Sequence, residues 1–176
     1  MGHINGKIAL ITGASSGIGE KTARSLCEAG VRVICSGRRA RRLEAIAAEL
    51  GGDAITLELD VTSERSVETL LDRLPKEWRD IDILVNNAGH DIGGRRLFHE
   101  GTVQEWSAII ETNVIGLMRV SRVVLEGMIR RDAGHIVNIG SIAGIQTSPL
   151  CSVYSASKHA VHGFSETLRL DYANTR

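Results

Sequence analysis

This sequence of 176 residues has few aromatic residues, few cysteines and no net charge. Aromatic residues make up only 3% of the chain, which leaves little material for stacking the bases of single-stranded nucleic acid. Lys and Arg together number 21, as do Asp and Glu, so no net charge attracts nucleic acid or an anionic membrane. The three cysteines, Cys27, Cys35 and Cys151, are too few and too dispersed for a disulfide scaffold or a four-ligand zinc site. We therefore expect neither a nucleic-acid partner nor a bound metal.

Long apolar runs are missing as well. No stretch approaches the roughly 20 apolar residues that a membrane-spanning helix needs, and residues 1–7 lack the apolar centre of a signal peptide. The sequence thus predicts a cytoplasmic protein without a membrane partner, because a reducing compartment suits unpaired cysteines. Proline occurs only at Pro75 and Pro149, and no linker-like tract marks a domain boundary. With 43% hydrophobic residues, residues 1–176 are expected to form one domain.

The sequence does contain a repeated alternation of short apolar runs and amphipathic stretches. The apolar runs lack polar alternation, which is typical of strands buried on both faces. They are residues 8–11, 31–35, 54–59, 81–85 and 136–139. Between them, apolar residues recur at helical spacing, as in Leu43, Ile46, Ala47 and Leu50 and in Val67, Leu70, Leu71 and Leu74. This succession predicts the α/β class, a doubly wound parallel sheet of the Rossmann type in three α/β/α layers.

Two longer helices are expected in the second half of the chain. Thr102 and Glu105 have the spacing of a capping box, and a helical pattern continues from them toward Met128. A final helix is expected from about Val153.

A glycine-rich turn stands between the first strand and the first helix. Its residues are Thr12, Gly13, Ala14, Ser15, Ser16, Gly17, Ile18 and Gly19. Glycine lets the backbone approach a pyrophosphate closely, and the free N–H groups of the following helix favour an anion. An ordinary strand-to-helix turn is the alternative. A P-loop is disfavoured because Glu20 separates Gly19 from Lys21 and brings a negative charge to the phosphate position.

The end of the second strand indicates which dinucleotide binds. An NAD-binding domain commonly has Asp or Glu there, but this chain has Arg38 and Arg39. A guanidinium forms charge-assisted hydrogen bonds with a phosphate, so these residues favour the 2′-phosphate of NADP(H). Arg41 and Arg42, by contrast, are interpreted as a solvated helix start.

Polar residues also follow the later strands. Asn87, Ala88 and Gly89 follow the fourth strand, and Ser141 comes shortly after the fifth. Tyr154 and Lys158 are four residues apart and therefore neighbours on one helical face. Each feature alone has a plain structural explanation, either as a turn or as a chance helical pair.

Together, the segments TGASSGIG, NNAG and YSASK, with Asn113 and Ser141 between them, resemble the motifs of the short-chain dehydrogenase/reductase family in order and approximate spacing. The resemblance covers almost the whole chain. Within the family, GRRARRLEAI, LPKEWRDIDILVNNAG and GMIRRDAGHIVNIGSIAG resemble the bacterial NADP-dependent 3-hydroxy acid dehydrogenases that act on L-allo-threonine or serine.

The resemblance implies a role for each matching residue. Tyr154 would donate a proton in carbonyl reduction and accept one in alcohol oxidation, with Lys158 stabilising its phenolate and holding the nicotinamide ribose. Ser141 would bind the substrate oxygen together with Tyr154, and Asn113 would position a proton-relaying water. Residues expected to contact the cofactor are Gly13, Ser15, Ser16, Gly17, Ile18, Gly19, Arg38, Arg39, Asp60, Val61, Asn87, Ala88, Gly89, Tyr154 and Lys158. For Asp60, a role in starting a helix is an equal alternative.

The resemblance also raises expectations about the rest of the protein. Family members continue beyond the active-site helix into further strands and a mobile substrate loop, which are expected to lie outside these 176 residues. A chain ending at Arg176 would leave the fifth strand unpaired on one side, favouring association or weak turnover. The long helices resemble those of family dimer interfaces, so a homodimer or homotetramer is expected. The expected substrate is a small carbonyl or alcohol. The alternative function is a catalytically silent NADP-binding or oligomerisation module.

Overall fold

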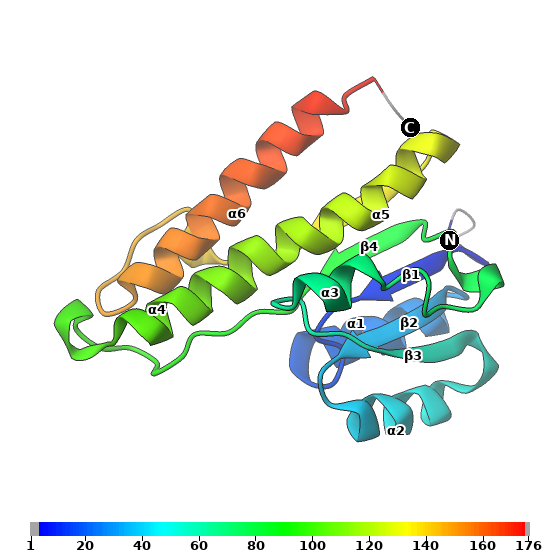
Figure 1. Cartoon of the computed structure of the whole chain (residues 1–176), viewed down its shortest axis with the longest axis horizontal. Helices are drawn as coiled ribbons and strands as arrows, with labels where there is room; N and C mark the ends of the chain where they lie inside the picture. Colours follow the sequence, from blue (N-terminus) through cyan, green and yellow to red (C-terminus); the bar gives the residue numbers. More distant parts are fainter. Residues whose placement is uncertain (1–3, 175–176) are drawn as a thin grey trace.

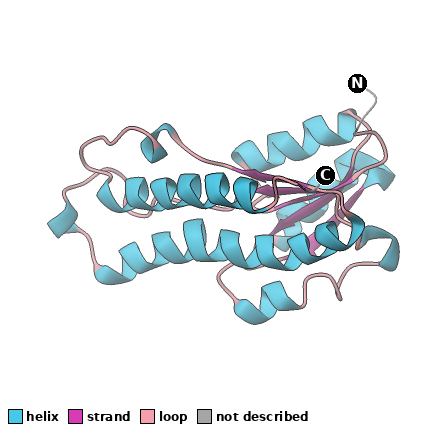
Figure 2. Ribbon diagram, turned by 90° about the horizontal axis from the view of Figure 1, so that it is seen from above, coloured by secondary structure: helices cyan, strands magenta, loops and turns pink. Residues whose placement is uncertain are grey.

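The computed structural model describes residues 4–174, in which five parallel strands form one sheet flanked by helices (Figures 1 and 2). The strands are β1 Ile8–Ile11, β2 Arg32–Gly37, β3 Ala54–Glu58, β4 Ile83–Asn86 and β5 His135–Asn138. They lie in the order β3-β2-β1-β4-β5. The α/β class predicted from the alternating apolar runs is confirmed; β1 has the predicted bounds, and the ends of the other strands differ from the predicted ones by at most two residues.

The α-helices are α1 Gly17–Glu28, α2 Ala40–Leu50, α3 Glu64–Glu68, α4 Val103–Ile110, α5 Leu117–Arg131 and α6 Ser152–Asp171. Short 3-10 turns occur at Gly51–Asp53, Lys76–Trp78, Phe98–Glu100 and Ile142–Gly144. The green to yellow helix α4–α5 and the orange helix α6 run side by side and project beyond the sheet (Figure 1). None of the helices within residues 4–174 combines the length and apolar character needed to cross a membrane.

The hydrophobic core lies on both faces of the sheet because successive side chains of a strand point in opposite directions. In β1, Ile8 and Leu10 belong to the cluster packed against α3 and α5. Ala9 and Ile11 belong to the cluster packed against α1 and α2. All four residues are buried, which explains why the first strand has no polar alternation in the sequence.

The helical stripe predicted from Val67 to Leu74 is only partly a helix, since α3 ends at Glu68. The residues after it form turns, although Leu70 and Leu74 are still buried in the core. Arginine side chains replace the missing helical hydrogen bonds: Arg73 donates to Ser66 O at 2.6 Å, and Arg79 donates to Leu74 O at 2.9 Å. The apolar spacing therefore marked burial correctly and overestimated the length of the helix.

The long helix that follows Thr102 begins as predicted. The Thr102 hydroxyl accepts a hydrogen bond from Glu105 N at 3.2 Å, and the Glu105 carboxylate accepts one from Thr102 N at 2.8 Å. Between α4 and α5, however, residues Glu111–Gly116 form a π-helical segment. Such segments widen the helix locally and are frequent at functional sites. Gly116 lets this segment approach the turn after β3, because an added Cβ would lie 2.7 Å from Val61 Cγ2.

The strand order places the ends of β1 and β4 at the centre of the sheet. The chain moves from β1 outward to β2 and β3 and then crosses back to β4 and β5. Ligands of open α/β sheets bind at such a reversal, outside the carboxyl ends of the strands. The glycine-rich turn follows β1 and the segment Asn87–Gly89 follows β4, so both motifs reach this position.

Candidate active site

A cavity of about 800 Å³ opens at the carboxyl ends of the strands. Its wall brings together most of the residues singled out from the sequence: Gly13, Ser15, Ser16, Ile18, Arg38, Arg39, Asp60, Val61, Asn87, Ala88, Gly89, Ser141, Tyr154 and Lys158. Gly17, Gly19 and Asn113 do not line the cavity. Gly17 and Gly19 lie in the first turn of α1, and Asn113 is buried in the π-helical segment.

The glycine-rich turn is held against β4 by Thr12 and Asn87. The Thr12 hydroxyl accepts hydrogen bonds from Asn87 N and Ala88 N, both at 3.0 Å, and the Asn87 side-chain amide donates to Thr12 O at 2.9 Å. Gly13 and Gly17 have φ of 68° and 59°, a left-handed conformation that favours glycine. Gly19 has no room for a side chain, since an added Cβ would lie 2.5 Å from Gly13 O. The turn is therefore rigid and close to the start of α1.

The two arginines after β2 differ in their contacts. Arg39 donates to Ser15 Oγ at 2.8 Å and to Ser16 Oγ at 2.5 Å, which fixes its guanidinium on the glycine-rich turn. Arg38 lines the cavity. Together these side chains place two positive charges and two hydroxyls at one end of the cavity. This set suits a phosphate group, whose oxygens accept charge-assisted hydrogen bonds.

Asp60 shapes the turn after β3. Its carboxylate accepts hydrogen bonds from Thr62 N at 3.0 Å and from Thr62 Oγ1 at 2.8 Å. The helix-start alternative is not met directly, because the N-cap of α3 is Ser63, whose hydroxyl accepts a hydrogen bond from Ser66 N at 3.3 Å. Asp60 and Val61 also line the cavity, so an adenine at this point would meet both residues.

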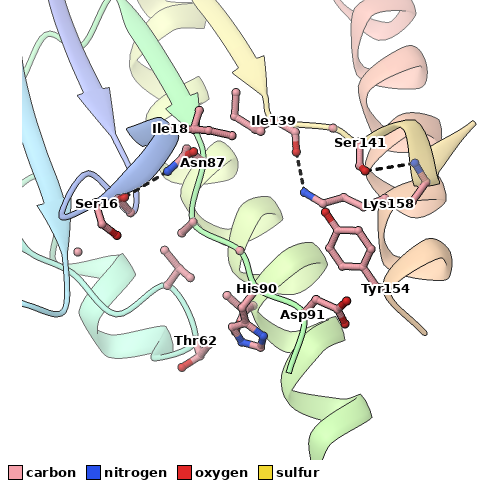
Figure 3. A pocket seen from close by; sticks show the side chains of 18 of the residues that line it. Ser16, Ile18, Thr62, Asn87, His90, Asp91, Ile139, Ser141, Tyr154 and Lys158 are labelled. Atoms are coloured by element: carbon pink, nitrogen blue, oxygen red, sulfur yellow. Dashed lines mark hydrogen bonds between the residues drawn. The ribbon is translucent and has the colours of Figure 1, made fainter. Parts of the chain in front are cut away.

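Lys158 and Tyr154 project from α6 into the cavity, on the opposite side from Ser16 of the glycine-rich turn (Figure 3). The Lys158 ammonium donates to Ile139 O at 2.7 Å and lies 5.8 Å from the centre of the Tyr154 ring. Burial lowers the pKa of the Lys158 ammonium, because charge is poorly solvated there. An anion beside this ammonium, such as a phenolate, would be stabilised by it.

Ser141 begins the turn that follows β5 and faces the same space (Figure 3). Its hydroxyl accepts a hydrogen bond from Ala143 N at 3.2 Å, which orients the oxygen and leaves its proton available to a ligand. Gly144 lets this turn pack on α6, since an added Cβ would lie 2.6 Å from Lys158 O. The close packing fixes Ser141 relative to Lys158.

Asn113 lies in the π-helical segment, 1% exposed. Its side-chain amide donates to His90 O at 3.0 Å and to Ser157 Oγ at 3.1 Å, while its oxygen accepts from His90 N at 2.9 Å. Ser157 Oγ in turn donates to Tyr154 O at 2.7 Å. Asn113 therefore joins the chain after β4 to the helix that carries Tyr154, and it does so through buried hydrogen bonds.

No sequence pattern assigns a role to His90, and the structure places this residue in the wall of the cavity. Its Nε2 lies 2.9 Å from Thr112 Oγ1, and within the described residues its Nδ1 is buried without a partner. Burial lowers the pKa of the imidazole, and the positive charge of Arg38 lowers it further. A single histidine beyond a matched motif has no spacing partner, so the sequence held no signal for this position.

A second residue without a sequence prediction is Asn86, which is 3% exposed at the end of β4. Its amide donates to Ser121 Oγ at 2.8 Å and to Asn138 Oδ1 at 2.9 Å, and Asn138 donates to Ser165 Oγ at 2.9 Å. This hydrogen-bonded chain joins α5, β4, β5 and α6. It ties the carboxyl ends of the two strands to the helices that pack beside them.

The fold and this site define a dinucleotide-binding α/β protein with a Ser, Tyr and Lys set beside the binding cleft. Residues 7–176 match the short chain dehydrogenase family, and the chain belongs to that family. It is 45% identical over 168 residues to an NADP-dependent 3-hydroxy acid dehydrogenase, YdfG, of Salmonella typhi, covering 96% of this chain and 67% of that protein. The chain thus spans about two thirds of the length of this relative.

Solved structures show the same similarity to short chain dehydrogenases. A closed form of serine dehydrogenase complexed with NADP⁺ has a TM-score of 0.92 and 43% identity, covering 96% of this chain and 67% of the other. A short chain dehydrogenase/reductase from Burkholderia phymatum in complex with NAD has a TM-score of 0.91 and 32% identity, covering 99% of this chain and 63% of the other. The fold is therefore shared by relatives that bind either dinucleotide.

Proposed function

We propose that this chain is the nucleotide-binding and catalytic part of an NADP-dependent oxidoreductase that interconverts a secondary alcohol and a carbonyl, with a small 3-hydroxy acid as substrate. One observation carries the proposal: Ser141, Tyr154 and Lys158 line the same cavity as the glycine-rich turn and its two arginines. A catalytically silent binding module would have no chemical need for the first three residues beside the binding cleft.

The residues at the catalytic end divide the chemistry between them. In alcohol oxidation, the Tyr154 oxygen takes the hydroxyl proton of the substrate, and in reduction it returns that proton to the carbonyl oxygen. The Lys158 ammonium stabilises the phenolate form of Tyr154, and Ser141 holds the reacting oxygen of the substrate. Bound NADP(H) would accept or supply the hydride of the carbon that carries this oxygen. The alcohol thereby loses a hydride and a proton to become a carbonyl.

NADP(H) fits the arginine end of the cavity better than NAD(H). Arg38 and Arg39 replace the acid that would hold the ribose hydroxyls of NAD, and Arg39 is already fixed by Ser15 and Ser16. The relative named for 3-hydroxy acids is also NADP-dependent. By contrast, the Burkholderia phymatum relative with bound NAD is less similar, at 32% identity.

The substrate class and the assembly also belong to the proposal. One relative is named for 3-hydroxy acids and another for serine, so we assign a small hydroxy acid to the catalytic end.

The exposed sides of α5 and α6 carry Ile129 and Leu170, 45% and 64% exposed. These residues suit packing of a homodimer or homotetramer.

The proposal is tested by following NADP⁺ reduction with 3-hydroxy acids in the full chain. We expect turnover with NADP⁺ and a lower kcat/KM with NAD⁺. Replacing both Arg38 and Arg39 with alanine should reduce the preference for NADP⁺ by about 10- to 100-fold, because charge-assisted hydrogen bonds to the phosphate are lost. Tight NADP⁺ binding without turnover of any hydroxy acid would favour the silent module, and equal kcat/KM with NAD⁺ would contradict the assigned cofactor.

A further inference from the structure

The catalytic end of the cavity contains an arginine that the reaction described above does not use. Arg95 lines the cavity together with Ser141 and Tyr154. Its side chain makes no hydrogen bond or ion pair with any other residue in the range 4–174. Of the other cavity cations, Arg38 and Arg39 belong to the end of the glycine-rich turn, where Arg39 binds Ser15 and Ser16, and the Lys158 ammonium binds Ile139 O. Arg95 is therefore a free positive charge at the substrate end.

The backbone around Arg95 is anchored although its side chain is free. Arg96 N donates to Leu150 O at 2.9 Å, and the Arg96 guanidinium pairs with Glu105 at 2.6 Å. These contacts hold the loop between β4 and α4 against the segment that leads into α6. Arg95 immediately precedes this anchor point, so its position is restricted to the cavity wall. The neighbouring arginines thus have different tasks: Arg96 fixes the loop and Arg95 faces the cavity.

The positive charge of Arg95 acts electrostatically on Cys151, at the start of α6. The pKa of the Cys151 thiol is lowered, mainly by the hydrogen bond with the Ser148 side chain, and the Arg95 charge adds to this effect. Cys151 is 8% exposed and precedes Tyr154 by three residues. One opposing charge lines the same end of the cavity, that of Asp91, which acts electrostatically on His90 (Figure 3). A second anion there would be attracted by Arg95 and repelled by Asp91.

We propose that Arg95 binds the carboxylate of the substrate while Ser141 and Tyr154 hold its reacting oxygen. A guanidinium presents parallel N–H donors that match the two oxygens of a carboxylate, a fit that a lysine ammonium does not reproduce. The inference rests on the proposed function and adds the residue that distinguishes a hydroxy acid from a neutral alcohol. It makes Arg95 a specificity-determining residue.

The test compares 3-hydroxybutyrate with its methyl ester, which differs mainly in lacking the negative charge. Both are assayed with NADP⁺ in the full chain and in Arg95→Ala, Arg95→Lys and Asp91→Asn. We expect Arg95→Ala to lower kcat/KM for the acid by about 10- to 100-fold and to change the ester by less than about 3-fold. Arg95→Lys should restore part of the loss. Asp91→Asn should raise the ratio of kcat/KM for the acid to kcat/KM for the ester, because it removes the repulsion between Asp91 and the substrate carboxylate.

Two controls separate this role from others. Arg130→Ala removes an exposed arginine of α5 outside the cavity and should leave the ratio unchanged. We expect the KM for NADP⁺ to be unaffected in Arg95→Ala. That result would exclude a contact between Arg95 and the cofactor. If Arg95→Ala lowered acid and ester turnover equally, or changed neither, the carboxylate role would be wrong while the proposed function stood. If the unsubstituted chain turned over neither compound, the proposed function would fall, and the role of Arg95 with it.

Discussion

At the scale of single residues, His90 links the cavity to the pH dependence of stability. Burial and the charge of Arg38 lower its pKa in the folded chain below the ordinary 6.5. As pH falls below 6.5, the unfolded chain gains a proton at this position before the folded chain does. The folded state therefore loses stability in the window between 6.5 and the lowered pKa, and this loss is complete below both values.

We predict that His90→Gln makes the thermal midpoint of unfolding less sensitive to acid. Glutamine can retain a hydrogen bond with Thr112, which lies 2.9 Å from His90 Nε2, and it does not titrate. The midpoints of the two proteins should therefore converge or cross as pH is lowered from about 7 to about 5. His159→Gln serves as the control because its side chain is exposed on α6. Parallel midpoint curves for His90→Gln and the unsubstituted chain would refute the burial argument.

At the scale of elements, two helical glycines differ in whether their surroundings leave room for a side chain. In α1, a Cβ added to Gly19 would lie 2.4 Å from Asn87 Nδ2 and 2.5 Å from Gly13 O. In α6, a Cβ added to Gly163 would meet no atom within 4 Å. The first glycine is required for the close approach of helix and turn, whereas the second only weakens its helix.

We predict that Gly19→Ala lowers the free energy of unfolding by about 1 to 3 kcal/mol, because the turn must move to accommodate the methyl group. Gly163→Ala should raise it by about 0.5 to 1 kcal/mol through higher helix propensity. Urea denaturation of both variants measures the difference. Stabilisation by Gly19→Ala would show that α1 does not pack against the glycine-rich turn as described.

The elements also show where sequence patterns stop being informative. The parallel strands could be predicted because strands buried on both faces leave continuous apolar runs. The end of α3 at Glu68 could not, since turns anchored by Arg73 and Arg79 bury the same leucines that a helix would. The π-helical segment around Asn113 could not be predicted for a related reason: the apolar spacing of the flanking helices continues through it. Periodicity reports which side chains are buried and says less about how the backbone turns.

At the scale of the whole molecule, the candidate site exists because segments far apart in the sequence meet at one edge of the sheet. Ordered motifs could be assigned to this edge from the sequence, since the carboxyl ends of parallel strands lie together. The individual contacts could not be assigned. Arg39 on Ser15 and Ser16, and Asn113 between His90 and Ser157, depend on side-chain geometry that no spacing encodes.

The proposed function requires that this cavity binds NADP(H) and that Tyr154 transfers the proton. The most direct measurement is Tyr154→Phe in the full chain, comparing NADPH affinity by calorimetry with the rate of hydride transfer. The hydroxyl acts on the reacting oxygen in the transition state, so we predict nearly unchanged NADPH affinity and a rate reduced by about 100-fold or more. A Tyr154→Phe variant that kept near-normal turnover would contradict proton transfer by Tyr154.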